Sequence, residues 1–256
     1  MKKRYYIIIA AVSYLFFTLG NVPAAKVISL AEQSTKLPIQ LYGVHGSLWN
    51  GGAEKAIVKG QPHINDLSWS INPAMLLLAS LSGEVKGSIK NQNIVGNISY
   101  SAFGSFSASD VRATIDAATA QELLKLPMGE LSGTFNINVE SFSPNPEGIP
   151  EITAQIKWRN AKVTIIDTVD LGLVNLDLAP DDNEQLIAKI SSKNGDLLLN
   201  GKAKINNKKA YDLNLSITPE KKANENLRQS LKLFSKRQTD GTYLVKRKGK
   251  LSELGI

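Results

Sequence analysis

Apolar and polar residues alternate one by one through much of this chain, and no other feature constrains its fold as strongly. The alternation is strictest in Thr134–Glu140 and recurs in Ile94–Phe103, Leu171–Leu178 and Tyr211–Ile217. A period of two places apolar side chains on one face of a β-strand and polar ones on the other. Strands with one wet face are typical of antiparallel sheets. The sequence therefore predicts a mainly β fold with a large curved antiparallel β-sheet, open or a half-barrel.

Turn and helix signals separate the alternating segments. Asn194-Gly195 and Asn206-Asn207 suit tight hairpins, and the proline-rich residues 144–148 suit a longer loop. A few short helices are expected between the strands, because three segments have a cap residue or one apolar side. These segments are Asn72–Ala79, Asp116–Leu126 and Lys222–Phe234.

The N-terminal segment has the pattern of a membrane anchor. After Lys2-Lys3-Arg4, no charged residue occurs from Tyr5 to Ala25, and these 21 positions would span roughly 31 Å as a helix. Because the cations precede the apolar run, residues 1–4 are expected in the cytoplasm and the chain beyond about residue 25 on the other side. The alternative is a secretory signal peptide cleaved after Ala24, since Val22 and Ala24 are small residues at the recognised positions.

These patterns divide the chain into consecutive parts with different environments. The expected parts are a cytoplasmic tip (1–4), a transmembrane helix (5–22), a helical linker (23–36) and a periplasmic β-rich domain (37–256), with a soft boundary near 144–150. The predicted localisation is therefore the cell inner membrane, crossed once, with the N-terminus cytoplasmic and the bulk of the chain periplasmic.

The formal net charge of +7 does not indicate a nucleic-acid partner. Residues 1–4 contribute +3 and residues 220–256 contribute +6, so residues 5–219 carry −2. The basic C-terminal segment has two interpretations. It meets anionic headgroups or an acidic partner, or it protects an exposed edge strand from unwanted pairing.

No catalytic, metal-binding or cofactor-binding residues emerge from the sequence. The absence of cysteine excludes disulfides, thiolate zinc sites, iron–sulfur clusters and thiol nucleophiles. His45 and His63 have no zinc-site spacing, and Asp181–Glu184 lacks the spacing of a calcium loop. No G-x-S-x-G nucleophile motif occurs. The residues therefore provide no catalytic constellation.

Several short segments follow one another in an order that resembles a known family. Gly43-Val-His-Gly-Ser-Leu-Trp49 is followed by Leu67-Ser-Trp-Ser-Ile-Asn-Pro73, and Asp240-Gly-Thr-Tyr243 lies near the end. In this order and spacing the chain resembles protein N of the bacterial type II (general) secretion pathway. The residues that carry the resemblance, as structural or interaction positions, are Gly43, Gly46, Leu48, Trp49, Trp69, Pro73, Gly241 and Tyr243.

The resemblance implies an inner-membrane component of the machine that moves folded proteins from the periplasm across the outer membrane of a Gram-negative envelope. It implies no enzymatic activity and no cofactor, and its partners would be the inner membrane and other inner-membrane components of the type II secretion system. The β-rich region also resembles AsmA-like repeats associated with lipid handling. A periplasmic lipid-binding or lipid-transfer module, with acyl chains on an apolar sheet face, is therefore the alternative function.

Overall fold

The alternating segments form long antiparallel strands, as the sequence predicts. The computed structural model describes residues 5–6, 10, 14, 20–34, 39–58, 63–124, 129–165, 167–183, 185–221, 223 and 225–254. The chain divides into two compact units, Met1–Phe106 (unit 1) and Ser107–Ile256 (unit 2), and the division falls at the first residue of β7. The loop at 144–150, where a soft boundary was expected, lies inside unit 2 between two paired strands.

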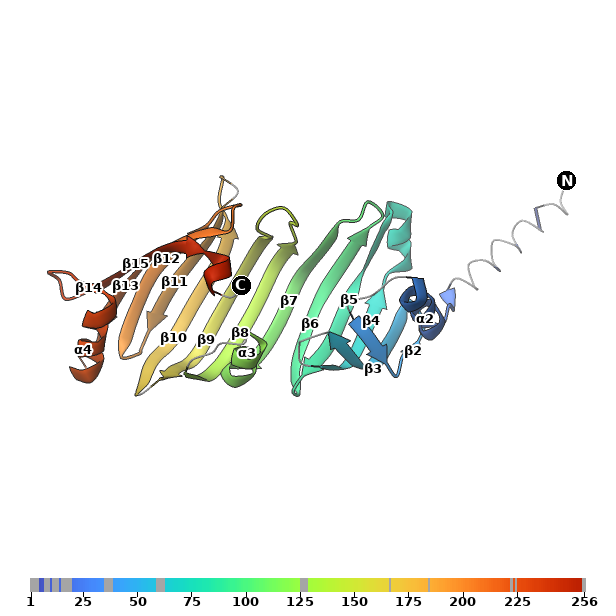
Figure 1. Cartoon of the computed structure of the whole chain (residues 1–256). Coiled ribbons are helices and arrows are strands. Elements are labelled where there is room, and N and C mark those ends of the chain that lie inside the picture. The colour runs from blue at the N-terminus through green and yellow to red at the C-terminus, as the bar shows by residue number, and fades with distance from the viewer. Residues whose placement is uncertain are drawn as a thin grey trace. The chain divides into compact units, whose positions relative to one another are not determined.

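Unit 1 is a helix followed by an antiparallel sheet (Figure 1). Its strands are ordered β1–β3–β4–β5–β6, and the short β2 also pairs with β3. The elements are α2 (Ala24–Ser34), β1 (Ile39–Tyr42), β2 (His45–Gly46), β3 (Asn50–Val58), β4 (Ile64–Ile71), the 3-10 helix η1 (Pro73–Leu78), β5 (Ser80–Ile89) and β6 (Gln92–Ser101).

Unit 2 is an antiparallel meander, in which each strand pairs with the next until β13, which pairs with β15. The short β14 pairs with the outer side of β15. The elements are β7 (Phe106–Asp116), α3 (Ala117–Leu123), β8 (Glu130–Ser143), β9 (Glu151–Thr164), β10 (Thr168–Pro180), β11 (Leu186–Lys193), β12 (Leu197–Ile205), β13 (Ala210–Pro219), α4 (Glu225–Phe234), β14 (Lys236–Arg237), β15 (Tyr243–Lys250) and the 3-10 helix η2 (Leu251–Leu254).

The predicted helices form where their start signals lie. The Asp116 carboxylate accepts a hydrogen bond from the Thr119 N–H at the start of α3, as an N-cap does. The Asn72 side chain likewise accepts from the Ala74 N–H, but the helix that follows is a short 3-10 helix. The third predicted helix is α4, which lies near β14 and β15.

The expected transmembrane helix, residues 5–22, falls mostly on residues outside the described part of the chain. Among the residues that the structure describes, no helix is long and apolar enough to cross a membrane. The helical linker that was expected next is present as α2, and β1 begins at Ile39.

Burial is shallow, as expected for sheets that are covered on few sides. Among the described residues no large side chain is fully buried, and the most deeply buried apolar residues are alanines such as Ala53, Ala56 and Ala161. Most apolar strand residues are half-buried instead. A sheet normally buries its apolar face against a second layer, so half-buried apolar residues indicate incomplete cover.

Bulges in β9 and β10 reverse the alternation in unit 2. Asn160 and Gly172 have φ angles of 49° and 68°, and the pairing of the two strands shifts on either side of Gly172. Trp158 and Ala161 therefore point to the same side although three positions separate them. The uninterrupted alternation predicted for Leu171–Leu178 is wrong, because Leu173 and Leu176 are three positions apart and β10 pairs regularly with β11 between them. Leu173 therefore lies on the polar side, where it pairs with Lys193.

Candidate functional site

A tight turn between β2 and β3 gathers the first group of motif residues. Gly46 has φ 76°, and a Cβ atom there would lie 2.6 Å from the carbonyl oxygen of Asn50, so the turn requires glycine. On the neighbouring strand, the indole N–H of Trp69 donates a 3.0 Å hydrogen bond to the carbonyl oxygen of Leu48. We call residues 43–53 together with Trp69 the β2–β3 junction.

The β2–β3 junction holds the segment that leads into α2. The Leu48 N–H donates to the Val22 carbonyl oxygen over 2.8 Å, and Pro23 forms an isolated antiparallel bridge with Ser47. The side chain of Ala24, the first residue of α2, is completely buried. The chain immediately after the predicted membrane segment is thus fixed to the edge of the sheet.

The remaining residues that carry the resemblance occupy turns, a helix start and a packed position. Gly43 has φ 64°, Trp49 is buried, and Pro73 is the first residue of η1. In unit 2, Gly241 has φ 85° in the turn before β15, and Tyr243 is only 3% exposed. The first six motif residues therefore belong to unit 1, and these last two belong to unit 2. A role for any of them in interaction stays a prediction.

Unit 2 presents a continuous apolar face. Directly paired residues on neighbouring strands point to the same side, so the register shows which residues share a face. One row contains only apolar residues and glycine from β7 to β15. Its members are Ala113, Ile137, Ile156, Leu176, Ile190, Gly201, Leu215 and Val245. In the next row, Phe135 and Trp158 stack with their ring centroids 4.9 Å apart. We call this side of the sheet the apolar face.

The opposite side of unit 2, from β9 to β15, is strongly basic. By the same register, ten exposed cations lie on this side among the side chains that the structure describes, namely Lys157, Arg159, Lys162, Lys189, Lys193, Lys202, Lys204, Lys246, Lys248 and Lys250. Only four carboxylates share these strands and this side, namely Glu151, Asp170, Asp177 and Asp212. We call this side the basic face.

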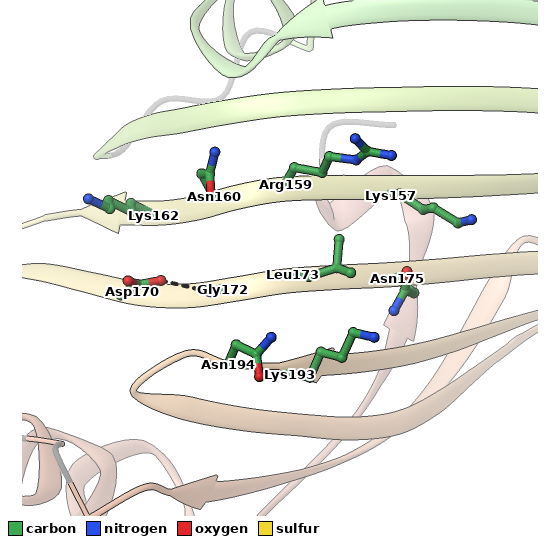
Figure 2. Close-up of a pocket in the computed structure, with 10 residues that line it drawn as sticks. All are labelled: Lys157, Arg159, Asn160, Lys162, Asp170, Gly172, Leu173, Asn175, Lys193 and Asn194. Carbon is green, nitrogen blue, oxygen red and sulfur yellow. Dashed lines mark hydrogen bonds between the residues drawn. The ribbon is translucent and has the colours of Figure 1, made fainter.

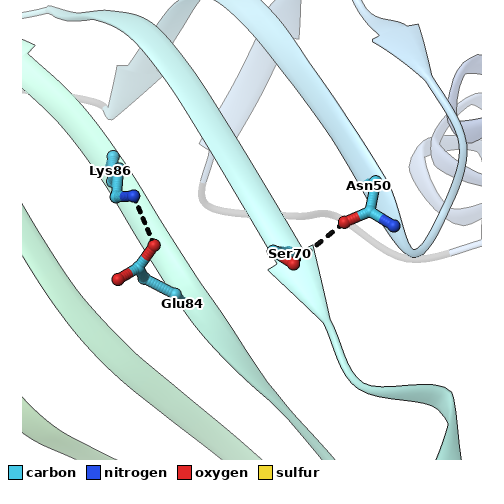
Figure 3. A network of polar contacts seen from close by, with 4 residues as sticks. All are labelled: Asn50, Ser70, Glu84 and Lys86. Carbon is cyan, nitrogen blue, oxygen red and sulfur yellow. Dashed lines mark hydrogen bonds and ion pairs between the residues drawn. The ribbon is translucent and has the colours of Figure 1, made fainter.

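Among the described residues of the basic face, Lys248 has a direct acidic partner. Lys248 Nζ lies 2.8 Å from Asp212 Oδ2, and this hydrogen bond lowers the pKa of Asp212. The polar side of unit 1 is different, because Lys86 and Glu84 form a pair at 2.5 Å and Ser70 donates to Asn50 (Figure 3). Lys86 thus has an acidic partner beside it on its own strand, whereas on the basic face cations exceed carboxylates.

Counting charges by segment concealed the basic face. Residues 5–219 carry −2 in total, yet most acidic residues of that segment lie outside the basic face, on other strands (Glu54, Glu84), in helices or in turns (Asp181). The lysines lie instead at every second position of the strands. The sequence signal that could have found the face is therefore the position of each lysine relative to the apolar alternation.

The residues considered for metal binding do not converge. His45 lies on β2 with its Nδ1 3.0 Å from the Gly43 carbonyl oxygen, and His63 is exposed before β4. Asp181 accepts from the backbone of Asn183 and Gln185, which makes it a turn residue with a lowered pKa. No three potential ligands from His, Asp and Glu come together within the described ranges.

A polar hollow of about 670 Å³ lies on the basic face between β9, β10 and β11 (Figure 2). Its lining includes Lys157, Arg159, Lys162 and Lys193, with Leu173 between them. The sequence analysis missed this hollow because the hollow depends on the bulges in β9 and β10. The alternation of apolar and polar residues does not show where such bulges occur.

Comparison with known proteins gives the family. Residues 38–246 match the family model for the type II secretion system (T2SS), protein N, and the match covers most of the chain. This chain belongs to the type II secretion protein N family. No curated protein and no solved structure matches it.

The type II secretion protein N match includes the β2–β3 junction, Gly241, Tyr243 and nearly all of the sheet in both units. The resemblance stated from the motifs is therefore confirmed. The family takes part in type II secretion and protein transport as a structural component, and it is not known for enzymatic activity. Other components of the secretion system are accordingly its expected partners.

Replacing the two motif glycines by alanine separates backbone strain from steric overlap. We expect Gly46→Ala to lower the free energy of unfolding by about 2–4 kcal/mol. The added Cβ atom would be strained by the left-handed backbone and would also overlap the carbonyl oxygen of Asn50. Gly241→Ala is the matched control, since its φ is 85° but nothing lies within 4 Å of the added Cβ. Gly241→Ala should lower the free energy of unfolding by only about 1–2 kcal/mol. Denaturant titrations of the full chain measure both, and equal losses would contradict the structural role of the β2–β3 junction.

Proposed function

We propose that this protein is a non-enzymatic inner-membrane component of the type II secretion system. It supports assembly of the apparatus or export of folded proteins from the periplasm across the outer membrane. The family match supports the secretion role, and the charge pattern of residues 1–25 supports the membrane location. In this proposal residues 5–22 span the membrane once and the sheets lie in the periplasm.

The observation that carries this proposal is the fixed position of residues 22–24 against the β2–β3 junction. A cut after Ala24 would separate Val22 and Pro23 from the chain and remove their contacts with Leu48 and Ser47. Those contacts favour an anchor that is retained after export. They also suggest that the membrane helix would continue into a rigid attachment to the edge of the sheet.

Single cysteines test the topology, because the natural chain contains none. We expect Lys208→Cys, in the exposed turn between β12 and β13, to react with a membrane-impermeant maleimide in spheroplasts. Lys3→Cys should react only after the membrane is permeabilised. Labelling of both variants in intact spheroplasts, or a mature protein that begins at Ala25, would contradict the retained anchor.

Deletion of the gene tests the secretion role separately. We expect exported folded proteins to accumulate in the periplasm of the deletion strain, and the wild-type gene to restore their release. Gly46→Ala should restore less release than Gly241→Ala if the β2–β3 junction matters for function. Unchanged secretion in the deletion strain would contradict the proposed role.

A second candidate function, lipid binding, is favoured by the apolar face of unit 2. Its central residues, such as Ile156, Leu176 and Leu215, are only half-buried, and the row that contains them continues across eight strands. Acyl chains would complete the cover that a second layer normally provides. In this alternative the protein binds or transfers lipid in the periplasm.

Native mass spectrometry of the detergent-extracted full chain distinguishes the two candidates. If the protein binds lipid, phospholipid should remain bound at a fixed ratio to the protein chain. Leu176→Gln on the apolar face should then reduce the amount of bound phospholipid several-fold. Asn200→Gln, at an exposed position on the basic face of β12, is the matched control and should leave the amount of bound phospholipid unchanged. Recovery of stoichiometric secretion components without lipid would contradict the second candidate.

A further inference from the structure

The hollow on the basic face has features of a binding site for phosphate groups. It exists because the bulges at Asn160 and Gly172 displace the strands from a regular pleat. Its volume of about 670 Å³ lies within the range of small-molecule sites. Only glycine fits at position 172, because a Cβ atom there would lie 2.2 Å from the carbonyl oxygen of Lys193.

The charges that line the hollow are unbalanced. Lys157, Arg159, Lys162 and Lys193 are all exposed, and no ion pair involves them in the described part of the chain. Asp170 is the one carboxylate in the lining, where it accepts the Gly172 N–H over 2.7 Å and contributes one negative charge. Four cations outnumber this one carboxylate, so an anionic ligand would meet a net positive lining.

The spacing of the cations indicates the size of the ligand. The pairing of β9 with β8 places Lys157 and Lys162 four residue steps apart, about 13 Å along the strand, because the bulge takes up one residue. Lys193 is two strands away, about 10 Å across the sheet. One phosphate group cannot contact cations spread this widely. A group with two or more phosphates can, and Arg159 can hold one of them with paired hydrogen bonds.

The other contents of the hollow fit the same ligand class. Asn160, Asn175 and Asn194 have side-chain amides that can donate to phosphate oxygens or sugar hydroxyls. Figure 2 shows Leu173 between the cations of β9 and Lys193 of β11. Leu173 thus provides an apolar contact in the middle of a polar lining, which suits a molecule whose phosphates are linked by a carbon skeleton.

We propose that this hollow binds a ligand bearing two or more phosphate groups, either a soluble molecule or the headgroup of a lipid. The site lies on the side of the sheet opposite the apolar face, so the inference does not depend on the secretion or lipid roles proposed above. Its occupation would leave the apolar face unobstructed.

Isothermal titration calorimetry of the full chain in detergent micelles tests this site with inorganic phosphate, pyrophosphate and tripolyphosphate. We expect tripolyphosphate to bind at least about tenfold more tightly than phosphate, because it reaches more cations. The double substitution Arg159→Gln with Lys193→Gln should weaken tripolyphosphate binding at least about tenfold. The double substitution Lys202→Gln with Lys246→Gln removes the same charge outside the hollow and should change binding less than about twofold.

Competition by mixed micelles distinguishes the two sources of phosphate. Cardiolipin has two phosphates in its headgroup, whereas phosphatidylserine at equal total charge has isolated ones. Displacement of tripolyphosphate by cardiolipin alone assigns the site to a lipid headgroup, and displacement by neither lipid assigns it to a soluble ligand. Both results support the site.

Three outcomes would overturn the proposal. The first is no binding of pyrophosphate, tripolyphosphate or cardiolipin. The second is an equal loss of affinity in the two double variants, which would show that the whole basic face attracts anions without a site. The third is tighter binding of an acidic peptide such as polyglutamate, with the same dependence on Arg159 and Lys193, because that would assign the hollow to a protein partner.

Discussion

The register of the antiparallel strands determines the chemistry of unit 2. Because directly paired residues point to the same side, a slip by one residue would exchange the two sides of a strand, so that residues of the apolar face would face water and the lysines of the basic face would lie on the apolar face. The pairing of Ile156 with Leu176 and of Leu176 with Ile190 therefore fixes the positions of Lys157 and Lys189 as well. The apolar face and the basic face are two consequences of one pattern.

The β-bulges add what a regular sheet cannot provide. A regular pleat would place cations at uniform intervals on a flat surface, whereas the left-handed residues Asn160 and Gly172 hollow that surface locally. The same irregularity keeps Trp158 and Ala161 together on the apolar face. Strand irregularity thus concentrates recognition chemistry at one place on an otherwise repetitive sheet.

Much of the fold was predictable because its signals are local. The alternation in Thr134–Glu140 predicts β8, and the cap at Asp116 predicts the start of α3, since both depend on neighbouring residues. The basic face and the hollow were not predicted, because they depend on which strands pair and where a pairing shifts. The glycines at 43 and 46 were found from the family resemblance, but their physical role became visible only with the contacts of Gly46 and Trp69.

The most direct test of this account is a cysteine scan along β9 in the full chain, with the rate of reaction with a water-soluble maleimide as the readout. The register predicts fast reaction at positions 155, 157 and 159 and slow reaction at 156 and 158. The phase should then reverse at Asn160, so that Ala161→Cys reacts slowly and Lys162→Cys reacts fast. Uniform rates, or an alternation that continues through Asn160 without a change of phase, would contradict the account.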